Sequence, residues 1–190
     1  MTDTRKVLEA ASALSHALRE RGVGHAFHGG IIPAVLAQSP LTYDVVCIVE
    51  GGQWHPFRRV RDALAGNTMF TVIQSTWTNR LHVRYLLCTP MIELEILPAG
   101  EFGPRILNST TCMRISGLPY LSISEFVRAK LKLWMISGVE RDAQDICFAV
   151  TNYWARVDFN RVPENDMVQF VLRYPSVAQA WEAIRRKYNA

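Results

Sequence analysis

Three acidic residues lie in stretches with the composition of β-strands. Asp44 lies in one such stretch, and Glu93 and Glu95 lie in a later one. Clustered carboxylates of this kind hold Mg²⁺ for two-metal phosphoryl transfer, because Mg²⁺ needs nearly octahedral oxygen coordination. Two positions after Asp44, on the same face of its strand, the chain has Val46, which supplies no oxygen. On this face of the strand, therefore, Asp44 offers ligand oxygens and Val46 offers none.

The spacing of apolar residues predicts the elements that position these side chains. In the first part of the chain we expect helices over 7–18, 31–38 and 54–64, and strands over 25–28, 43–49, 69–73, 80–87 and 92–97. Three or four helices follow, over 122–137, 140–154, 164–174 and 176–188, and Ser122 and Glu125 have the spacing of a capping box. The fold class expected is α/β (α+β), a small mixed β-sheet flanked by helices. Residues 1–117 would form this core, and 118–190 a C-terminal helical tail packed on it as one compact unit.

Composition narrows the functional classes. The chain has 190 residues, 49% of them hydrophobic, which is ample for a packed core. Its four cysteines have no C-x-x-C spacing, which favours free thiols in a reducing compartment over disulfides or zinc. The polar N-terminus and the lack of a long apolar stretch predict a soluble, cytoplasmic protein with no membrane partner. The formal charge of +4 is dispersed, so a nucleic-acid partner is not expected.

The order of several motifs resembles that of the nucleotidyltransferase-fold superfamily, especially its minimal and toxin-system members. The resemblance rests on the turn Gly29-Gly30 between strand and helix, on Asp44, and on the later strand that carries Glu95. Lys130 and the R-D-x-x-D-I run after it are similar to the helical tail of those proteins. The resemblance implies a sheet of nucleotidyltransferase type, with Asp44, residue 46 and Glu95 at the positions of the metal-binding carboxylates.

The departures from that family pattern are equally specific. The family usually has an arginine where this chain has Pro40, a glycine where it has Ala37, and a second carboxylate where it has Val46. We therefore expect a degenerate metal motif, with no metal ligands and no cofactor. Mg²⁺ would be needed only if Asp44 acted with Glu93 and Glu95 instead.

A cleft altered in this way would suit a small apolar molecule, because apolar walls with a few placed polar groups are typical of such sites. Its predicted residues are of two kinds. The expected catalytic residues are His28, Arg84 and Lys130 as hydrogen-bond donors, with Asp44 and Glu95 to orient them. The expected substrate-binding residues are Gly29, Gly30, Val46, His82, Glu93 and Trp134.

Structural roles stay open for several of these residues. Gly29-Gly30 could be only a tight turn, and His28 only a structural histidine. Lys130 could extend to solvent along an apolar helix face, and the acidic residues after it could be helix charge pairs. A hairpin turning at Thr89-Pro90 would place Arg84 opposite Glu95 and neutralise it.

Three functional hypotheses follow. The first is a repurposed nucleotidyltransferase-fold enzyme, a cyclase or cycloaddition catalyst of secondary metabolism that closes a ring in a small apolar metabolite without metal. The second is a Mg²⁺-dependent nucleotidyltransferase using Asp44 with Glu93 or Glu95. The third is a non-catalytic binding protein, such as a partner in a toxin–antitoxin-type pair. The oligomeric state does not follow from the sequence.

Overall fold

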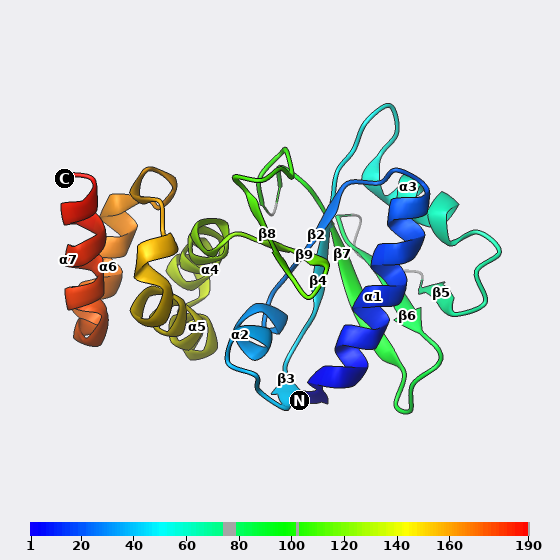
Figure 1. Ribbon diagram of the computed structural model, residues 1–190, viewed down its shortest axis with the longest axis horizontal. Helices are drawn as coiled ribbons and strands as arrows, with labels where there is room; N and C mark the ends of the chain where they lie inside the picture. The colour runs from blue at the N-terminus through cyan, green and yellow to red at the C-terminus, as the bar shows by residue number, and fades with distance from the viewer. Residues whose placement is uncertain (74–78, 102, 190) are drawn as a thin grey trace. The chain divides into compact units, whose positions relative to one another are not determined.

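The computed structural model describes residues 1–73, 79–101 and 103–189 (Figure 1). Contacts within the chain define two compact units, Met1–Tyr120 and Leu121–Ala190. The packing of a tail from residue 118 on the core stays a prediction. None of the helices in these ranges combines the length and the apolar character needed to cross a membrane.

The first unit is built around a mixed β-sheet. Its strands are β2 (His25–His28), β4 (Val46–Val49), β5 (Phe70–Ile73), β6 (Leu81–Tyr85), β7 (Ile92–Pro98), β8 (Cys112–Ile115) and β9 (Leu118–Leu121). They lie in the order β5-β6-β7-β4-β2-β9-β8. The β4–β7 and β2–β9 pairs are parallel, whereas β2–β4, β5–β6 and β6–β7 are antiparallel. A separate two-stranded sheet joins β1 (Thr2–Asp3) to β3 (Leu41–Thr42). The predicted mixed α/β fold class is confirmed.

Three helices belong to this unit: α1 (Thr4–Glu20), α2 (Ile31–Leu36) and α3 (Pro56–Leu64). The first and third pack on each other and on β7 (Figure 1). Because side chains alternate along strands, this helix-covered face carries the fully buried Phe27, Cys47 and Ile96. The other face carries the alternate residues of the same strands, which include His28, Val46 and Glu95.

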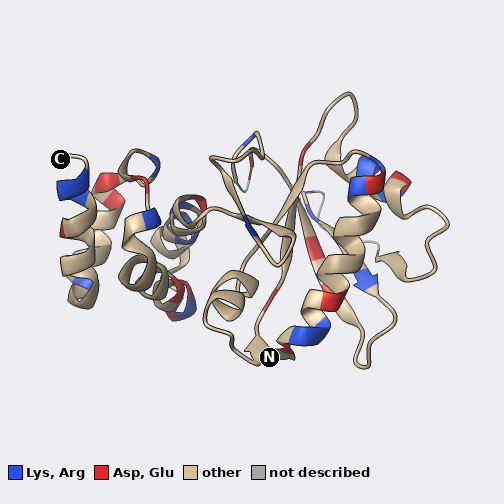
Figure 2. Ribbon diagram, viewed as in Figure 1, with Lys and Arg blue, Asp and Glu red and all other residues tan. Residues whose placement is uncertain are grey.

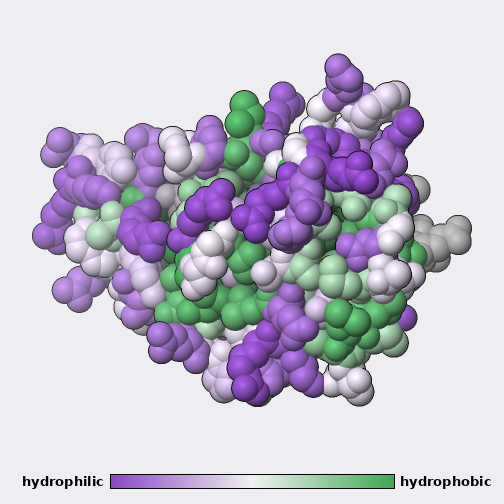
Figure 3. Space-filling model, turned by 45° about the vertical axis from the view of Figure 1, so that its right-hand side comes forward, coloured by the Kyte–Doolittle hydropathy of each residue, from purple (hydrophilic) through white to green (hydrophobic). Residues whose placement is uncertain are grey.

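The second unit is helical. It contains α4 (Ile123–Ser137), α5 (Glu140–Tyr153), α6 (Glu164–Arg173) and α7 (Ala178–Lys187), with short 3-10 turns at Trp154–Arg156, Phe159–Arg161 and Pro175–Val177. The Ser122 hydroxyl caps α4 by accepting from the Glu125 amide at 3.4 Å. Gly138 ends the helix with a left-handed φ of 65°, which glycine adopts at little cost. Apolar side chains also reach the surface among polar ones (Figure 3), as is ordinary for proteins.

Two parts of the fold differ from the sequence prediction. Strand β4 begins at Val46 rather than at residue 43, so Asp44 lies just before the strand. The hairpin of β8 and β9 was not predicted. Its signal in the sequence is Ser116-Gly117, whose φ angles of 50° and 82° suit a tight two-residue hairpin turn.

The predicted register between β6 and β7 is wrong. Arg84 pairs with Glu93, and His82 pairs with Glu95. The prediction assumed a two-residue turn at Thr89-Pro90. Favoured turns of that length need a positive φ at the first residue, which is unfavourable for the β-branched Thr89, and type I′ also needs one at the second, which Pro90 cannot adopt. The chain instead leaves the ladder after Tyr85 and returns at Ile92. Every pairing is therefore displaced by two residues, which keeps each side chain on its predicted face.

We predict that the stability of the first unit falls in mild acid because of His25. The ring is buried, its Nδ1 donates to the Val23 carbonyl at 2.9 Å, and its Nε2 accepts from the Ser15 hydroxyl at 2.8 Å. Burial lowers the pKa of His25 below its usual 6.5, so the folded state resists the proton that the unfolded state accepts. The stabilisation is full above pH 6.5 and is lost as the pH falls through the lowered pKa.

Urea unfolding at a series of pH values from 8 to 5 measures this effect. His25→Gln should flatten the pH dependence, while His16→Gln, at an exposed position of the same unit, should leave it unchanged. An identical pH profile for all three proteins would contradict the prediction.

Candidate functional site

The predicted site begins where β2 ends. Gly29 turns the chain with a φ of 91°, and Gly30 precedes α2. The Gly30 amide donates to Asp44 Oδ1 at 2.6 Å, so a carboxylate satisfies one of the amides left open at the start of a helix. A Cβ at Gly30 would lie 2.6 Å from the same oxygen. The structure thus brings Gly29, Gly30 and Asp44 together, and the close approach explains why glycine is needed.

A row of side chains crosses the face of the sheet that α1 and α3 leave uncovered. Strand pairing aligns His28 with Val46, Val46 with Glu95, and Glu95 with His82. His28 and Val46 are buried, Glu95 and His82 are half-buried, and nearby Asp44 is exposed. Four predicted site residues therefore share one row, with valine between a histidine and a glutamate.

Basic residues on and beside β6 pair with both carboxylates of β7. Figure 2 shows acidic positions in red on the ribbon of β7 and basic positions in blue on β6 beside it. Arg80 Nη1 lies 2.6 Å from Glu95 Oε1, and Glu93 contacts His82 at 3.0 Å and Arg84 at 3.3 Å. The predicted partner of Glu95, Arg84, belongs to Glu93 instead, because of the register shift described above. These side chains are between a fifth and a half exposed, so each pair adds only modestly to stability.

The residues at this face do not fit a two-metal site. Asp44 is bonded to Gly30, Glu95 to Arg80, and the position between them is Val46. Among the described residues, no three His, Cys, Asp or Glu side chains are grouped so that they could hold a metal ion. The carboxylates present therefore do not form the oxygen cage that Mg²⁺ requires.

Lys130 belongs to the helical unit and is held there by two acids. Its ammonium lies 2.8 Å from both Asp142 Oδ1 and Asp145 Oδ2, and the side chain is only 6% exposed. Burial alone would lower the pKa of Lys130, but the charges and hydrogen bonds of Asp145 and Asp142 raise it above its usual value. Lys130 is therefore a buried, charged residue that does not extend to solvent. Its role as a substrate donor stays a prediction.

Trp134, one turn after Lys130, lies in an aromatic cluster of the same unit. Its ring is 4.9 Å from that of Phe170 and 5.9 Å from that of Tyr174, both edge-on. Its buried indole Nε1 has no hydrogen-bond partner among the described residues. The proposed role of Trp134 in an apolar site wall stays a prediction.

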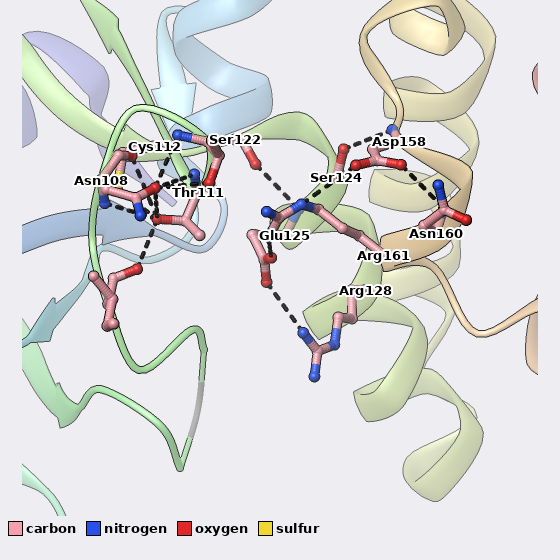
Figure 4. A network of polar contacts seen from close by, with 12 residues as sticks. Asn108, Thr111, Cys112, Ser122, Ser124, Glu125, Arg128, Asp158, Asn160 and Arg161 are labelled. Carbon is pink, nitrogen blue, oxygen red and sulfur yellow. Dashed lines mark hydrogen bonds and ion pairs between the residues drawn. The ribbon is translucent and has the colours of Figure 1, made fainter.

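Sequence reasoning missed the buried carboxylate of Glu125 and its ion pairs. This residue was expected to complete a capping box, but its side chain, 2% exposed, binds Arg161 at 2.6 Å and Arg128 at 3.6 Å (Figure 4). Beside it, the Ser124 hydroxyl accepts from the Asp158 amide at 2.8 Å. Only the S-x-x-E spacing was visible in the sequence, because the main partner is 36 residues away. Glu125 thus joins α4 to the 3-10 turn that contains Arg161.

Solved structures reveal what this architecture is similar to. An antigenic nucleotidyltransferase-like protein from Paracoccidioides brasiliensis matches with a TM-score of 0.69 and 17% identity, over 95% of this chain and 94% of that one. The chain has the nucleotidyltransferase fold. The predicted fold is thereby confirmed, whereas the degenerate metal motif stays a prediction.

Two further structures share the nucleotidyltransferase fold of this protein. ANT(2'')-Ia in complex with adenylyl-2''-tobramycin has a TM-score of 0.56 and 13% identity, over 90% of this chain and 99% of that one. JHP933 from Helicobacter pylori has a TM-score of 0.55 and 14% identity, over 93% and 78%. No family model and no curated protein matches the sequence. At these identities the likeness shows the fold alone.

We predict that Gly30 is required only because of Asp44. Gly30→Ala should destabilise the protein by about 1 to 3 kcal/mol, because the new Cβ overlaps the carboxylate oxygen. In an Asp44→Ala background the same change should cost much less, since the φ of −60° at Gly30 suits alanine. Urea unfolding of the two single variants and the double variant measures this coupling. Strictly additive effects would show that the contact does not constrain the turn.

We predict that Lys130→Met destabilises the protein by about 3 kcal/mol, because it leaves two largely buried carboxylates, 14% and 13% exposed, without their cation. Lys132→Met on the same helix is the matched control, because Lys132 is exposed. Chemical denaturation of both variants near neutral pH makes the comparison. Equal losses would mean that the buried ion pairs contribute nothing specific.

Proposed function

We propose that this nucleotidyltransferase-fold protein is a metal-independent enzyme of secondary metabolism that binds a small, largely apolar molecule beside Val46. The proposed reaction is an intramolecular cyclisation or cycloaddition. The observation that carries the proposal is the row across the sheet, in which Val46 lies between His28 and Glu95. A carbon side chain thus occupies the place where two-metal transfer would need an oxygen ligand.

The surrounding residues support binding of an apolar molecule. Ile48 and Leu97 pair in the next row of the same face, so Val46 continues an apolar surface along β4. The carboxylates that could contribute to a metal site are engaged by Gly30, Arg80, His82 and Arg84. Apolar walls with a few oriented polar groups describe a site for a small organic molecule better than one for a triphosphate.

A cyclisation fits these groups chemically. A cycloaddition within one molecule forms two carbon–carbon σ bonds at the expense of two π bonds and releases nothing, so it needs neither cofactor nor leaving-group stabilisation. The site would hold the substrate folded with its reacting carbons close together. His28 would donate to a polarised carbonyl oxygen. In this proposal Arg84 is a second donor, and Asp44 and Glu95 order the polar side of the site through the Gly30 amide and Arg80.

The first test is calorimetric titration with ATP, CTP, GTP and UTP in the presence of Mg²⁺ or Mn²⁺. We expect no metal-dependent binding and no release of pyrophosphate by the wild-type protein. Asp44→Asn is the control. Metal-dependent binding that disappears in this variant would overturn the proposal and establish nucleotidyl transfer by Asp44 with Glu93 or Glu95.

The second test uses 1,7,9-decatrien-3-one, which carries a diene and a carbonyl-activated alkene in one chain. We expect the protein to accelerate its ring closure, and His28→Gln to lower the rate roughly ten- to a thousandfold, as loss of an oxyanion-type donor does. His16→Gln, at an exposed position, should retain the full rate. Equal rates for wild type and His28→Gln would remove His28 from the mechanism, and no acceleration would count against this class of reaction.

A further inference from the structure

A hollow of about 440 Å³ opens in the first unit, near the His25 end of β2. It lies at the opposite end of that strand from His28. Its lining is Arg19, Val23, Gly24, His25, Leu107, Asn108, Ser109, Cys112, Arg114 and Pro119. None of these belongs to the site predicted from the sequence. The volume is within the range of small-molecule sites, roughly 300 to 1,000 Å³.

The charge in this lining has one sign. Arg19 and Arg114 are its charged residues, and neither forms an ion pair with a described residue. Each guanidinium donates one hydrogen bond to a nearby backbone carbonyl. Arg19 donates to Ser15 at 3.3 Å, and Arg114 donates to Gly117 at 3.2 Å. Four of the five N–H groups of each guanidinium therefore remain for another acceptor.

The two arginine charges also act on His25, the histidine in the lining. Burial lowers the pKa of His25, and the charges of Arg19 and Arg114 lower it further. The carboxylate of Glu50 lies nearby, since it approaches Gly24 and accepts from the Leu107 amide at 2.5 Å, but one negative charge offsets only one of the two arginine charges. The hollow is therefore electropositive, with a neutral imidazole in its wall.

The rim is fixed before any ligand binds. Asn108 Oδ1 accepts from the Thr110 and Thr111 amides at 2.9 and 3.2 Å, and the Thr111 hydroxyl accepts from the Asn108 amide at 2.9 Å (Figure 4). This network holds Asn108 and Ser109 at the edge of the hollow. A rim ordered in advance lowers the entropy cost of binding.

We propose that this hollow binds a small organic anion, with its phosphate or carboxylate group between Arg19 and Arg114 and its apolar part against Val23, Leu107 and Pro119. The guanidinium groups match planar, charge-assisted recognition of such acids. The site is independent of the function proposed for the opposite end of β2, and each can fail without the other.

Cys112 provides a reporter, because it lines the hollow and is half-buried. Cys47 and Cys88 are buried, so in a Cys147→Ser protein Cys112 is the accessible thiol. The experiment measures the rate at which iodoacetamide alkylates Cys112, by mass spectrometry. Probes are phenyl phosphate, phenylacetate and neutral benzyl alcohol, each at millimolar concentration, and calorimetry gives their affinities.

We expect phenyl phosphate or phenylacetate to slow alkylation, benzyl alcohol to have little effect, and the better of the two anions to identify the acid group. Arg19→Gln and Arg114→Gln should each weaken anion binding roughly tenfold, the effect of losing a hydrogen bond between charged groups. Arg19→Lys should restore part of it. Arg61→Gln, which removes the same charge from an exposed position outside the lining, should have no effect.

Three results would overturn the proposal: no protection by either anion, equal protection by benzyl alcohol, or an equal loss in Arg61→Gln. Circular dichroism of each variant establishes that it is folded. Because nucleotide binding and ring closure are measured separately, failure here leaves the proposed function untouched.

Discussion

The contact between the Asp44 carboxylate and the Gly30 amide is the constraint on which the candidate site depends. It joins the turn between β2 and α2 to Asp44, which lies fourteen residues later and just before β4. A side chain larger than hydrogen at Gly30 would push the carboxylate away. Strand β4 begins two residues after Asp44, and its first residue, Val46, pairs with His28 and Glu95 on the face away from α1 and α3.

On the sheet face that carries Val46, burial and polarity change from one strand to the next. The face is buried and apolar at β4, mixed at β7, and charged at β6, where each acid of β7 has a basic partner. In the helical unit, charged side chains that are less exposed are also paired with opposite charges. Lys130 contacts two acids, and Glu125 contacts two arginines. Buried charges cost free energy unless they are paired, so these networks favour one arrangement of the helices over others.

Much of this could be predicted from the sequence because it depends on local patterns. The strand at His25–His28 and the helix starting at Glu140 lie where the apolar spacing placed them, and the resemblance in motif order gave the correct fold. The failures share a cause. The β6–β7 register, the partner of Glu95 and the partners of Lys130 and Glu125 are set by loop geometry and by contacts across many residues. No local period encodes such contacts.

The pairing of Phe27 with Tyr120 has a consequence for how the chain is made. Strand β2 obtains its neighbour β4 soon after it leaves the ribosome, but its other edge stays open until β9, more than ninety residues later, has been synthesised. An open strand edge invites pairing with other chains, and long-range parallel pairing closes slowly. The sheet therefore stays incomplete until β9, the last strand of its unit, has been synthesised. During translation the open edge of β2 is therefore available for pairing with other chains.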